Sequence, residues 1–174
     1  MAAGQTYTVI ASYTVPNTST TTYTFSSIPQ TYDDLELWMS ARNNANNYGG
    51  YEVRLNGSGS GNTQLYLRNS NGSSIVSNYA GNTTDFVHWP LNQDTASVFT
   101  TNTVYITNYS STTIGKVMLA RNGGRYYLGA TTNSQQGLNT GNYDTTSAIT
   151  SIGVGYGDAL AQNTVLTLYG IKRA

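Results

Sequence analysis

The stretch that decides the fold class is residues 35–42, LELWMSAR, because apolar and polar side chains alternate along it without a break. Successive side chains of a β-strand point to opposite faces, so one face of this strand would be apolar and the other would carry Trp38 with polar neighbours. The apolar, core-facing side would consist of Leu35, Leu37, Met39 and Ala41. A strand with this pattern is typical of an antiparallel sheet that packs one face against a second layer.

Similar strand patterns recur on both sides of this stretch, separated by turn residues. The run 43–50, rich in Asn and Gly, is predicted to be a loop, and the Asn-Gly pairs at 56–57 and 71–72 are predicted to end a strand and to form a tight hairpin turn. Asn-Gly-Gly at 122–124 is predicted to join two further strands as a hairpin. Strands are therefore expected at residues 6–15, 20–28, 35–42, 51–56, 64–68, 73–79, 84–88, 98–108, 114–122, 125–132, 148–153 and 164–171.

The stretch 165–171, VLTLYGI, has apolar residues on both faces and predicts a central strand with neighbours on each side and cover above and below. Roughly ten short strands at this spacing predict an all-β fold, a two-sheet antiparallel β-sandwich, and the expected arrangement is a jelly roll. We expect a single β-sandwich domain over residues 6–174, preceded by a flexible N-terminal arm at residues 1–5.

Composition excludes several classes of partner. Only 9% of the 174 residues are charged, and eight Lys and Arg balance eight Asp and Glu, so the chain lacks the field that gathers phosphates or anionic lipids. We therefore expect neither nucleic acid nor a membrane as a partner. There is no cysteine, which rules out disulfides and thiolate metal sites, and the first residues predict no signal peptide. Fifteen tyrosines on a background of Thr, Ser and Asn favour a protein that works through a broad contact surface.

Few residues carry the chemistry that catalysis needs. His88 is the sole histidine, has no Gly-x-Ser-x-Gly motif to accompany it, and is predicted to be a structural residue at a strand end. A glycosidase would need a pair of carboxylates across a cleft, and the densest cluster consists of Asp33, Asp34 and Glu36. We predict that these three are solvated charges of a turn and a strand. No catalytic residue is therefore assigned.

Cofactor and metal signals are equally sparse. The run 57–61, GSGSG, lacks the following Lys and helix of a phosphate cradle and is predicted to be a flexible loop. Asp144 and Asp158 are not set in an Asp-x-Asp-x-Asp-Gly calcium loop, so a metal-free protein without cofactor is expected.

Aromatic and arginine side chains provide the candidate contact residues. Residues 121–127, RNGGRYY, combine two guanidinium groups with two aromatic rings, which would stack on sugars or on a partner's side chains. The same segment reads equally well as a hairpin tip with ordinary cross-strand pairs. With the two tryptophans, the candidate partner-contact residues are Arg121, Arg125, Tyr126, Tyr127, Trp38 and Trp89.

Three segments carry a resemblance to a known group of proteins. Residues 23–37, YTFSSIPQTYDDLEL, with 148–152, AITSI, and 167–172, TLYGIK, resemble both ends of small virion structural proteins of tailed phages, found among capsid decoration and tail-fibre components. Many of these occur in phages of cyanobacteria and marine bacteria. The resemblance implies a virion protein synthesised in the cytoplasm of a bacterial host. Residues 42–142 show no such pattern, and this is where members of the group would differ in what they bind.

Two functions follow from the resemblance and the composition. The first is a non-enzymatic capsid decoration or cement protein, a homotrimer on the capsid surface that binds the major capsid protein and clamps neighbouring subunits, with residues 1–5 as a reaching arm. The alternative is a receptor-binding module of a tail fibre or spike, in which Trp and Tyr rings bind a surface glycan. An enzyme acting on polysaccharide is a distant third because candidate carboxylate pairs are few.

Overall fold

The computed structural model describes residues 6–16, 20–42, 50–57, 62–70, 74–83, 89–90, 98–128, 131–143 and 145–173. Every regular element in these ranges is a β-strand, and every strand pair is antiparallel. The strands are β1 (Tyr7–Thr14), β2 (Thr20–Phe25), β3 (Asp34–Ala41), β4 (Gly50–Leu55), β5 (Asn62–Ser70), β6 (Ser74–Thr83), β7 (Trp89–Pro90), β8 (Thr100–Ile106), β9 (Lys116–Leu128), β10 (Thr131–Tyr143), β11 (Ile152–Leu160) and β12 (Val165–Ile171).

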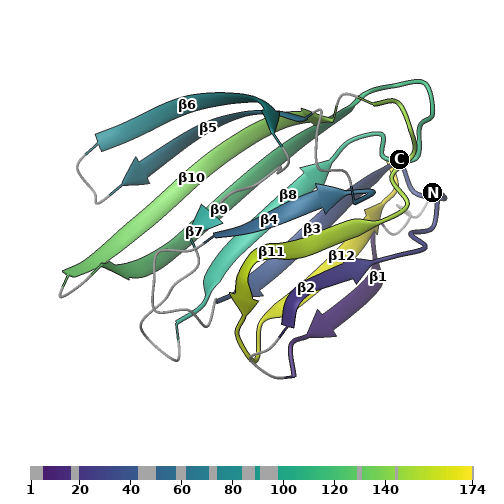
Figure 1. Ribbon diagram of the computed structural model, residues 1–174. Coiled ribbons are helices and arrows are strands. Elements are labelled where there is room, and N and C mark those ends of the chain that lie inside the picture. Colours follow the sequence, from purple (N-terminus) through teal and green to yellow (C-terminus); the bar gives the residue numbers. More distant parts are fainter. Residues whose placement is uncertain are drawn as a thin grey trace.

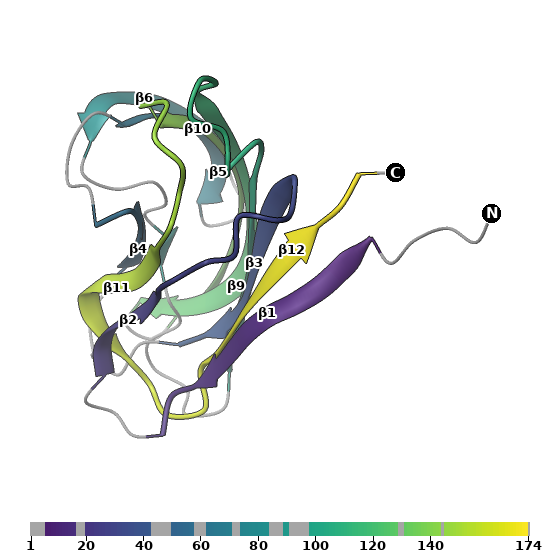
Figure 2. The same ribbon diagram turned by 90° about the vertical axis from the view of Figure 1, so that its right-hand side faces the viewer.

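The strands form two sheets of unequal size. The larger sheet has eight strands in the order β1-β12-β3-β8-β9-β10-β5-β6, and the smaller has four in the order β2-β11-β4-β7. Figure 2 shows the smaller sheet lying against one face of the larger sheet. In Figure 1, β5 and β6 lie at the upper left, far from β1 and β2 at the lower right. The predicted all-β sandwich of two antiparallel sheets is confirmed.

The hydrophobic core fills the space between the smaller sheet and the larger one, mainly against β1, β12, β3 and β8, with Met118 and Ala120 of β9 and Tyr143 of β10. The apolar face predicted for β3 is confirmed, since all four of its apolar side chains are buried. Tyr51, Val53 and Leu55 of β4 face them from the smaller sheet and are fully buried as well. At the open edge between β1 and β2, the rings of Tyr13 and Tyr23 stack with their centroids 3.8 Å apart. Alternation of apolar residues therefore identifies the inside of this part of the sandwich.

The central position predicted for the strand near the C-terminus is confirmed. β12 pairs with β1 on one side and with β3 on the other. Its inward residues, Leu166 and Leu168, are fully buried, whereas its outward residues are only partly covered.

The hairpin predicted at residues 122–124 is wrong. β9 runs without interruption from Lys116 to Leu128, and the chain reverses only after Leu128, where β9 pairs with β10. Gly124 serves close packing here, because a Cβ at that position would collide with the side chain of Thr100 on β8. A glycine can thus mark a tight approach between strands as well as a turn.

Other strand predictions are confirmed, missed or untested. The hairpin between β5 and β6 is confirmed by their antiparallel pairing from Ser70 and Ser74 onward. β10 is missed over most of its length because residues 133–142 have no apolar alternation, and residues 148–151, predicted as strand, precede the start of β11 at Ile152. The predicted strand at 84–88 and the predicted arm at 1–5 lie outside the described residues. Among the described residues, no helix is long and apolar enough to span a membrane.

Candidate binding surface

The outer face of the eight-stranded sheet, which points away from the smaller sheet, gathers the candidate contact residues. Trp38 lies on this face because its neighbours in sequence, Leu37 and Met39, point into the core. Strand register then places Thr103 of β8 beside Trp38, and Arg121 of β9 beside Thr103. Two of the candidates from the sequence, Trp38 and Arg121, therefore share one row across three adjacent strands.

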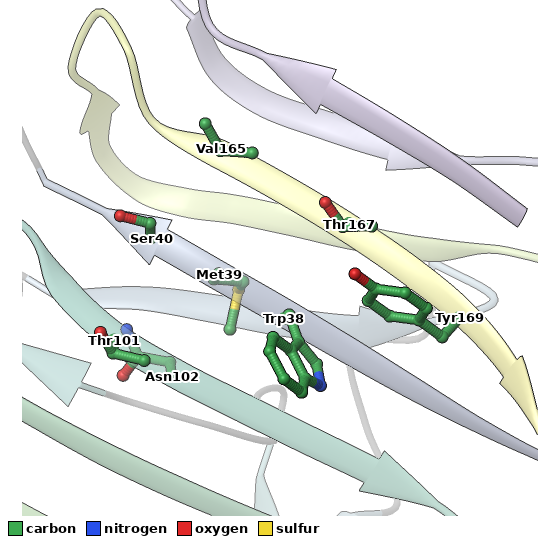
Figure 3. A pocket seen from close by; sticks show the side chains of 8 residues that line it. All are labelled: Trp38, Met39, Ser40, Thr101, Asn102, Val165, Thr167 and Tyr169. Atoms are coloured by element: carbon green, nitrogen blue, oxygen red, sulfur yellow. The ribbon is translucent and has the colours of Figure 1, made fainter. Parts of the chain in front are cut away.

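Three aromatic rings form a group on this face, which we call the aromatic platform (Tyr7, Trp38 and Tyr169). The Trp38 and Tyr169 rings meet edge to face with centroids 5.7 Å apart, and Tyr7 meets Tyr169 in the same manner at 6.2 Å. Figure 3 shows the Trp38 and Tyr169 rings projecting from neighbouring strands. Trp38 is 49% exposed, so a large part of its indole is available to a partner. Neighbouring rings hold Trp38 in place and reduce the side-chain entropy that binding would cost.

A shallow hollow lies on each side of Trp38. The first, of about 180 Å³, lies between Trp38 and Tyr169 and is bordered by Thr101 and Thr167 (Figure 3). The second, of about 400 Å³, lies between Trp38 and Arg121 and is bordered by Gly123. Gly123 leaves this second hollow open, since a Cβ at that position would meet no atom within 4 Å. The arrangement offers ring faces for stacking and hydroxyl and guanidinium groups for hydrogen bonds.

Glu36 lies beneath the aromatic platform and corrects the prediction that it is a solvated charge. It belongs to β3, which is a central strand, and it is 5% exposed. A hydrogen bond between the Tyr7 hydroxyl and Glu36 is the main reason that the pKa of Tyr7 is raised. Glu36 thus anchors a ring of the platform.

Asp34 is likewise a buried structural carboxylate, in contrast to the prediction. It is fully buried and accepts hydrogen bonds from the Tyr105 hydroxyl at 2.6 Å, the Asn108 backbone N–H at 2.9 Å and the Arg173 Nε at 2.9 Å, with a second bond from the Arg173 Nη2. Burial alone would raise the pKa of Asp34, but the hydrogen bonds from Arg173, Tyr105 and Asn108 outweigh burial and lower it. Burial and the bond to Asp34 raise the pKa of Tyr105 to about 12.

Lys116 is a buried cation that the sequence reading did not single out. Its Nζ donates to the carbonyl oxygens of Ser111 at 2.6 Å, Ile114 at 3.0 Å and Thr146 at 2.6 Å. Burial lowers the pKa of Lys116. Because all three ammonium protons are engaged by main-chain oxygens, this lysine fastens two loops together and has no proton free for a substrate.

A metal site does not emerge from the ranges that the structure describes, where no three His, Cys, Asp or Glu side chains gather around one point. His88 and Asp144 lie outside the described residues, and the side chain of Asp158 does too. The expected lack of metal and cofactor stays a prediction.

The remaining candidates from the sequence do not join the platform in the described part of the chain. Arg125, Tyr126 and Tyr127 belong to β9, but their side chains lie outside the described part. Trp89 belongs to β7 in the smaller sheet, so its backbone and that of Trp38 are in different sheets, and its side chain is also not described.

Tyr7 and Tyr169 are the members of the platform that the sequence reading missed. The sequence does place Tyr169 on the face of the VLTLYGI strand opposite the buried leucines. Grouping it with Trp38, however, requires the knowledge that this strand pairs with β3.

Comparison with protein-family models, with curated proteins and with solved structures gave no match for this chain. Its function therefore has to be argued from its own residues and geometry.

Proposed function

We propose that this protein is a non-enzymatic structural component of a tailed-phage particle, a decoration or cement protein that binds the major capsid protein on the outer shell as a homotrimer. The observation that carries the proposal is the aromatic platform with its two hollows and Arg121 on one open sheet face. Trp, Tyr and Arg are the residues that most often dominate the energy of protein–protein interfaces.

The shape of the surface favours a protein partner. Both hollows are shallow and lie on a sheet face, so they suit side chains that protrude from a facing surface. The only charges along the row through Trp38 and on the strand positions beside it are Glu36, which is buried, and Arg121. Binding then rests on shape and hydrogen bonds, and we expect it to depend weakly on ionic strength.

The described titratable groups support a role without catalysis. Asp34 is engaged by four donors and Lys116 by three acceptors, so neither has a free proton site directed at a cleft. Perturbed pKa values at these two residues have structural causes, namely burial and ion pairing.

The jelly roll expected from the sequence remains part of the proposal, and the strand order supports it. When β5, β6, β9 and β10 are set aside, the remaining eight strands follow the orders β1-β12-β3-β8 and β2-β11-β4-β7. Strands of the first and last parts of the chain then alternate between the two sheets, as two interlocked Greek keys require. The four other strands are two hairpins inserted between β4 and β7 and between β8 and β11. Domains of this kind are common in viral particles.

A receptor-binding role on a tail fibre is the second candidate, and one observation favours it. The hollow beside Trp38 and Tyr169 is bordered by the hydroxyl groups of Ser40, Thr101 and Thr167, a combination of ring faces and small polar groups that suits a sugar ring.

Binding of the purified protein to capsid shells that lack it tests the first role. We expect the wild type to bind and Trp38→Ala to bind at least tenfold more weakly, because the central indole is lost. Gly123→Thr places a side chain at the border of the second hollow, where its Cβ meets no atom within 4 Å, and should also weaken binding. Gly115→Ala is the matched control, since a Cβ there also meets no atom within 4 Å and Gly115 does not border either hollow. Failure of the wild type to bind shells, with Trp38-dependent binding to a glycan array, would favour the tail role.

A further inference from the structure

The outer face of the inserted hairpins carries exposed aliphatic and aromatic side chains where a solvated sheet would carry polar ones. These side chains, which we call the apolar patch, are between 38% and 78% exposed. The patch consists of Leu65, Leu67, Ile75, Tyr79, Val117, Leu119 and Leu138. Register makes them neighbours, since Leu67 lies opposite Leu138, and Leu65 lies opposite Tyr79. The patch thus extends over the four adjacent strands β9, β10, β5 and β6.

The inner face of the same strands has the opposite character. Gln64 and Asn139 are buried there, and Asn122 lies on the same side of the sheet. The side-chain oxygens of all three accept no hydrogen bond from the described residues. Met118 and Ala120 of β9 and Tyr143 of β10 still belong to the hydrophobic core on this side. Around Gln64, Asn122 and Asn139, however, the inside is polar and the outside is apolar, which is unfavourable for a chain that stays alone in water.

We infer that the apolar patch is the contact between copies of this chain, and that it faces the symmetry axis of a homo-oligomer. Three observations select a second copy as the occupant over an unrelated protein: the area of the patch, its charge and the character of the free edge beside it.

The area matches what a stable assembly needs. From their exposed fractions, the seven side chains leave on the order of 700 Å² accessible, above the ~300–600 Å² of the largest patch on a typical monomer. A standard interface buries about 800 Å² on each partner. Leu, Ile and Val predominate, as in permanent contacts between identical subunits.

The charge distribution permits identical surfaces to meet. Where identical patches meet around a symmetry axis, a charged patch would face patches of the same charge and be repelled by them. None of the seven residues carries a charge, and the chain as a whole has a formal net charge of zero. Arg121 lies opposite Leu138, on the side of the patch that faces the aromatic platform. An exposed apolar patch has to be covered as soon as the chain folds. Another copy of the chain is a partner that is present from the moment of synthesis.

The free edge of the sheet has the same character. β6 is the last strand of the eight-stranded sheet and is ten residues long, SIVSNYAGNT, without a proline or a charged residue. Edge strands that face water are normally protected by charges, prolines or bulges. β6 has neither of the first two devices, and its register shift against β5, between Asn62 and Gln64, lies near one end of the strand. The remainder of this edge is unprotected in a single chain, which supports shielding by neighbouring copies.

The patch and the aromatic platform need not compete for one partner. Adjacent strands of a sheet are rotated by about 20–25° relative to each other, so strands four places apart, such as β3 and β5, face directions that differ by roughly 80–100°. One sheet face can therefore present the platform to a shell and the patch to an axis.

Sedimentation velocity of the full chain over a concentration series in the micromolar range tests the inference. We expect an oligomer for the wild type and a monomer for the double variant Leu67→Lys/Leu138→Lys, which places two charges at the centre of the patch. Val9→Lys is the matched control, because Val9 is an equally exposed aliphatic residue at the opposite edge of the sheet and its variant should stay oligomeric. Thermal unfolding of each variant verifies that it is folded.

A thiol cross-link gives a second measurement that does not rely on a disruptive variant. The chain has no cysteine, so Leu67→Cys provides one thiol per chain, and a short bismaleimide should yield covalent dimers. A monomeric wild type, or a double-lysine variant that remains oligomeric, would overturn the inference. A monomeric protein whose binding to shells depends on the apolar patch would also overturn the inference, because the patch would then be the contact with the capsid protein. If the protein is oligomeric but does not bind capsid shells through the aromatic platform, only the proposed capsid role is rejected.

Discussion

The two halves of the eight-stranded sheet differ in what each places inside. β1, β12, β3 and β8 bury mainly apolar residues against the smaller sheet and carry the aromatic platform outside. β9 and β10 contribute Met118, Ala120 and Tyr143 to the same core, but the half formed by β9, β10, β5 and β6 also buries amides and exposes leucines. The first half is stabilised by a core within one chain. The second half depends more on strand pairing, and on our inference its exposed apolar side chains become buried in an assembly. Alternation therefore reveals a strand but does not reveal which side is the inside.

The largest difference between the halves should appear when one leucine of each is truncated. Leu168 of β12 is fully buried, so Leu168→Ala should lower the free energy of unfolding by about 3 kcal/mol. Leu138 of β10 is 40% exposed, so Leu138→Ala should lower it by less than about 1 kcal/mol in a dilute, dissociated sample. Urea unfolding measures both. Equal losses would contradict the distinction between the two halves.

The ion pair between Asp34, at the start of β3, and Arg173 should give the next largest effect. Asp34→Asn removes a charge that four hydrogen bonds stabilise, and we expect a loss of about 2 kcal/mol at neutral pH. The pKa of Asp34 is lowered in the folded state, so its contribution is present above the unfolded value of about 3.9 and is lost as pH falls through the folded value.

Urea midpoints from pH 7 down to about pH 2 measure this contribution, because the loss occurs below the unfolded pKa. The wild type should lose stability more steeply than Asp34→Asn over the acid range. Parallel pH profiles would show that Asp34 is not the group responsible.

Lys116 at the start of β9 should have an intermediate effect. Lys116→Met keeps the apolar stem but leaves the carbonyl oxygens of Ser111, Ile114 and Thr146 without their donor, which should cost about 1–2 kcal/mol. Hydrogen exchange should rise at the amides of the loops around residues 108–115 and 145–149. An unchanged exchange pattern would contradict the role of Lys116 as a residue that connects the two loops by hydrogen bonds.

The smallest effect on stability should come from the residue with the largest effect on binding. Trp38→Ala removes a half-exposed ring and should change the free energy of unfolding by about 1 kcal/mol or less. The same variant should lose most of its affinity for the partner surface. A variant that unfolds readily would mean that Trp38 belongs to the structure rather than to the binding surface.

The sequence predicted the first half of the sheet well because a single chain buries it. Leu35, Leu37 and the VLTLYGI strand show their inner faces directly, and Trp38 follows as an outward residue. The second half was harder for physical reasons. Leu65 and Leu67 look like core residues although they point outward, and β10 has no apolar period at all.

Long-range contacts explain the remaining differences. Asn-Gly-Gly at 122–124 resembles a turn, yet Thr100 on a neighbouring strand is what makes a side chain impossible at Gly124. Asp34 reads as a surface charge until Arg173, far away in sequence, is brought beside it. Of the candidate contact residues, Trp38 and Arg121 come together because register links three strands, which local pattern cannot reveal.

If the proposed capsid role is right, a cryo-electron-microscopy reconstruction of the phage particle will show directly which faces of this protein are buried. We expect copies on the outer shell in which the platform around Trp38 contacts the major capsid protein, the apolar patch around Leu67 faces the axis between copies, and the smaller sheet is turned to solvent. Copies that bury the smaller sheet and leave the outer face of the eight-stranded sheet in water would contradict the account. Density at the tail tip alone would move the platform to the receptor-binding role.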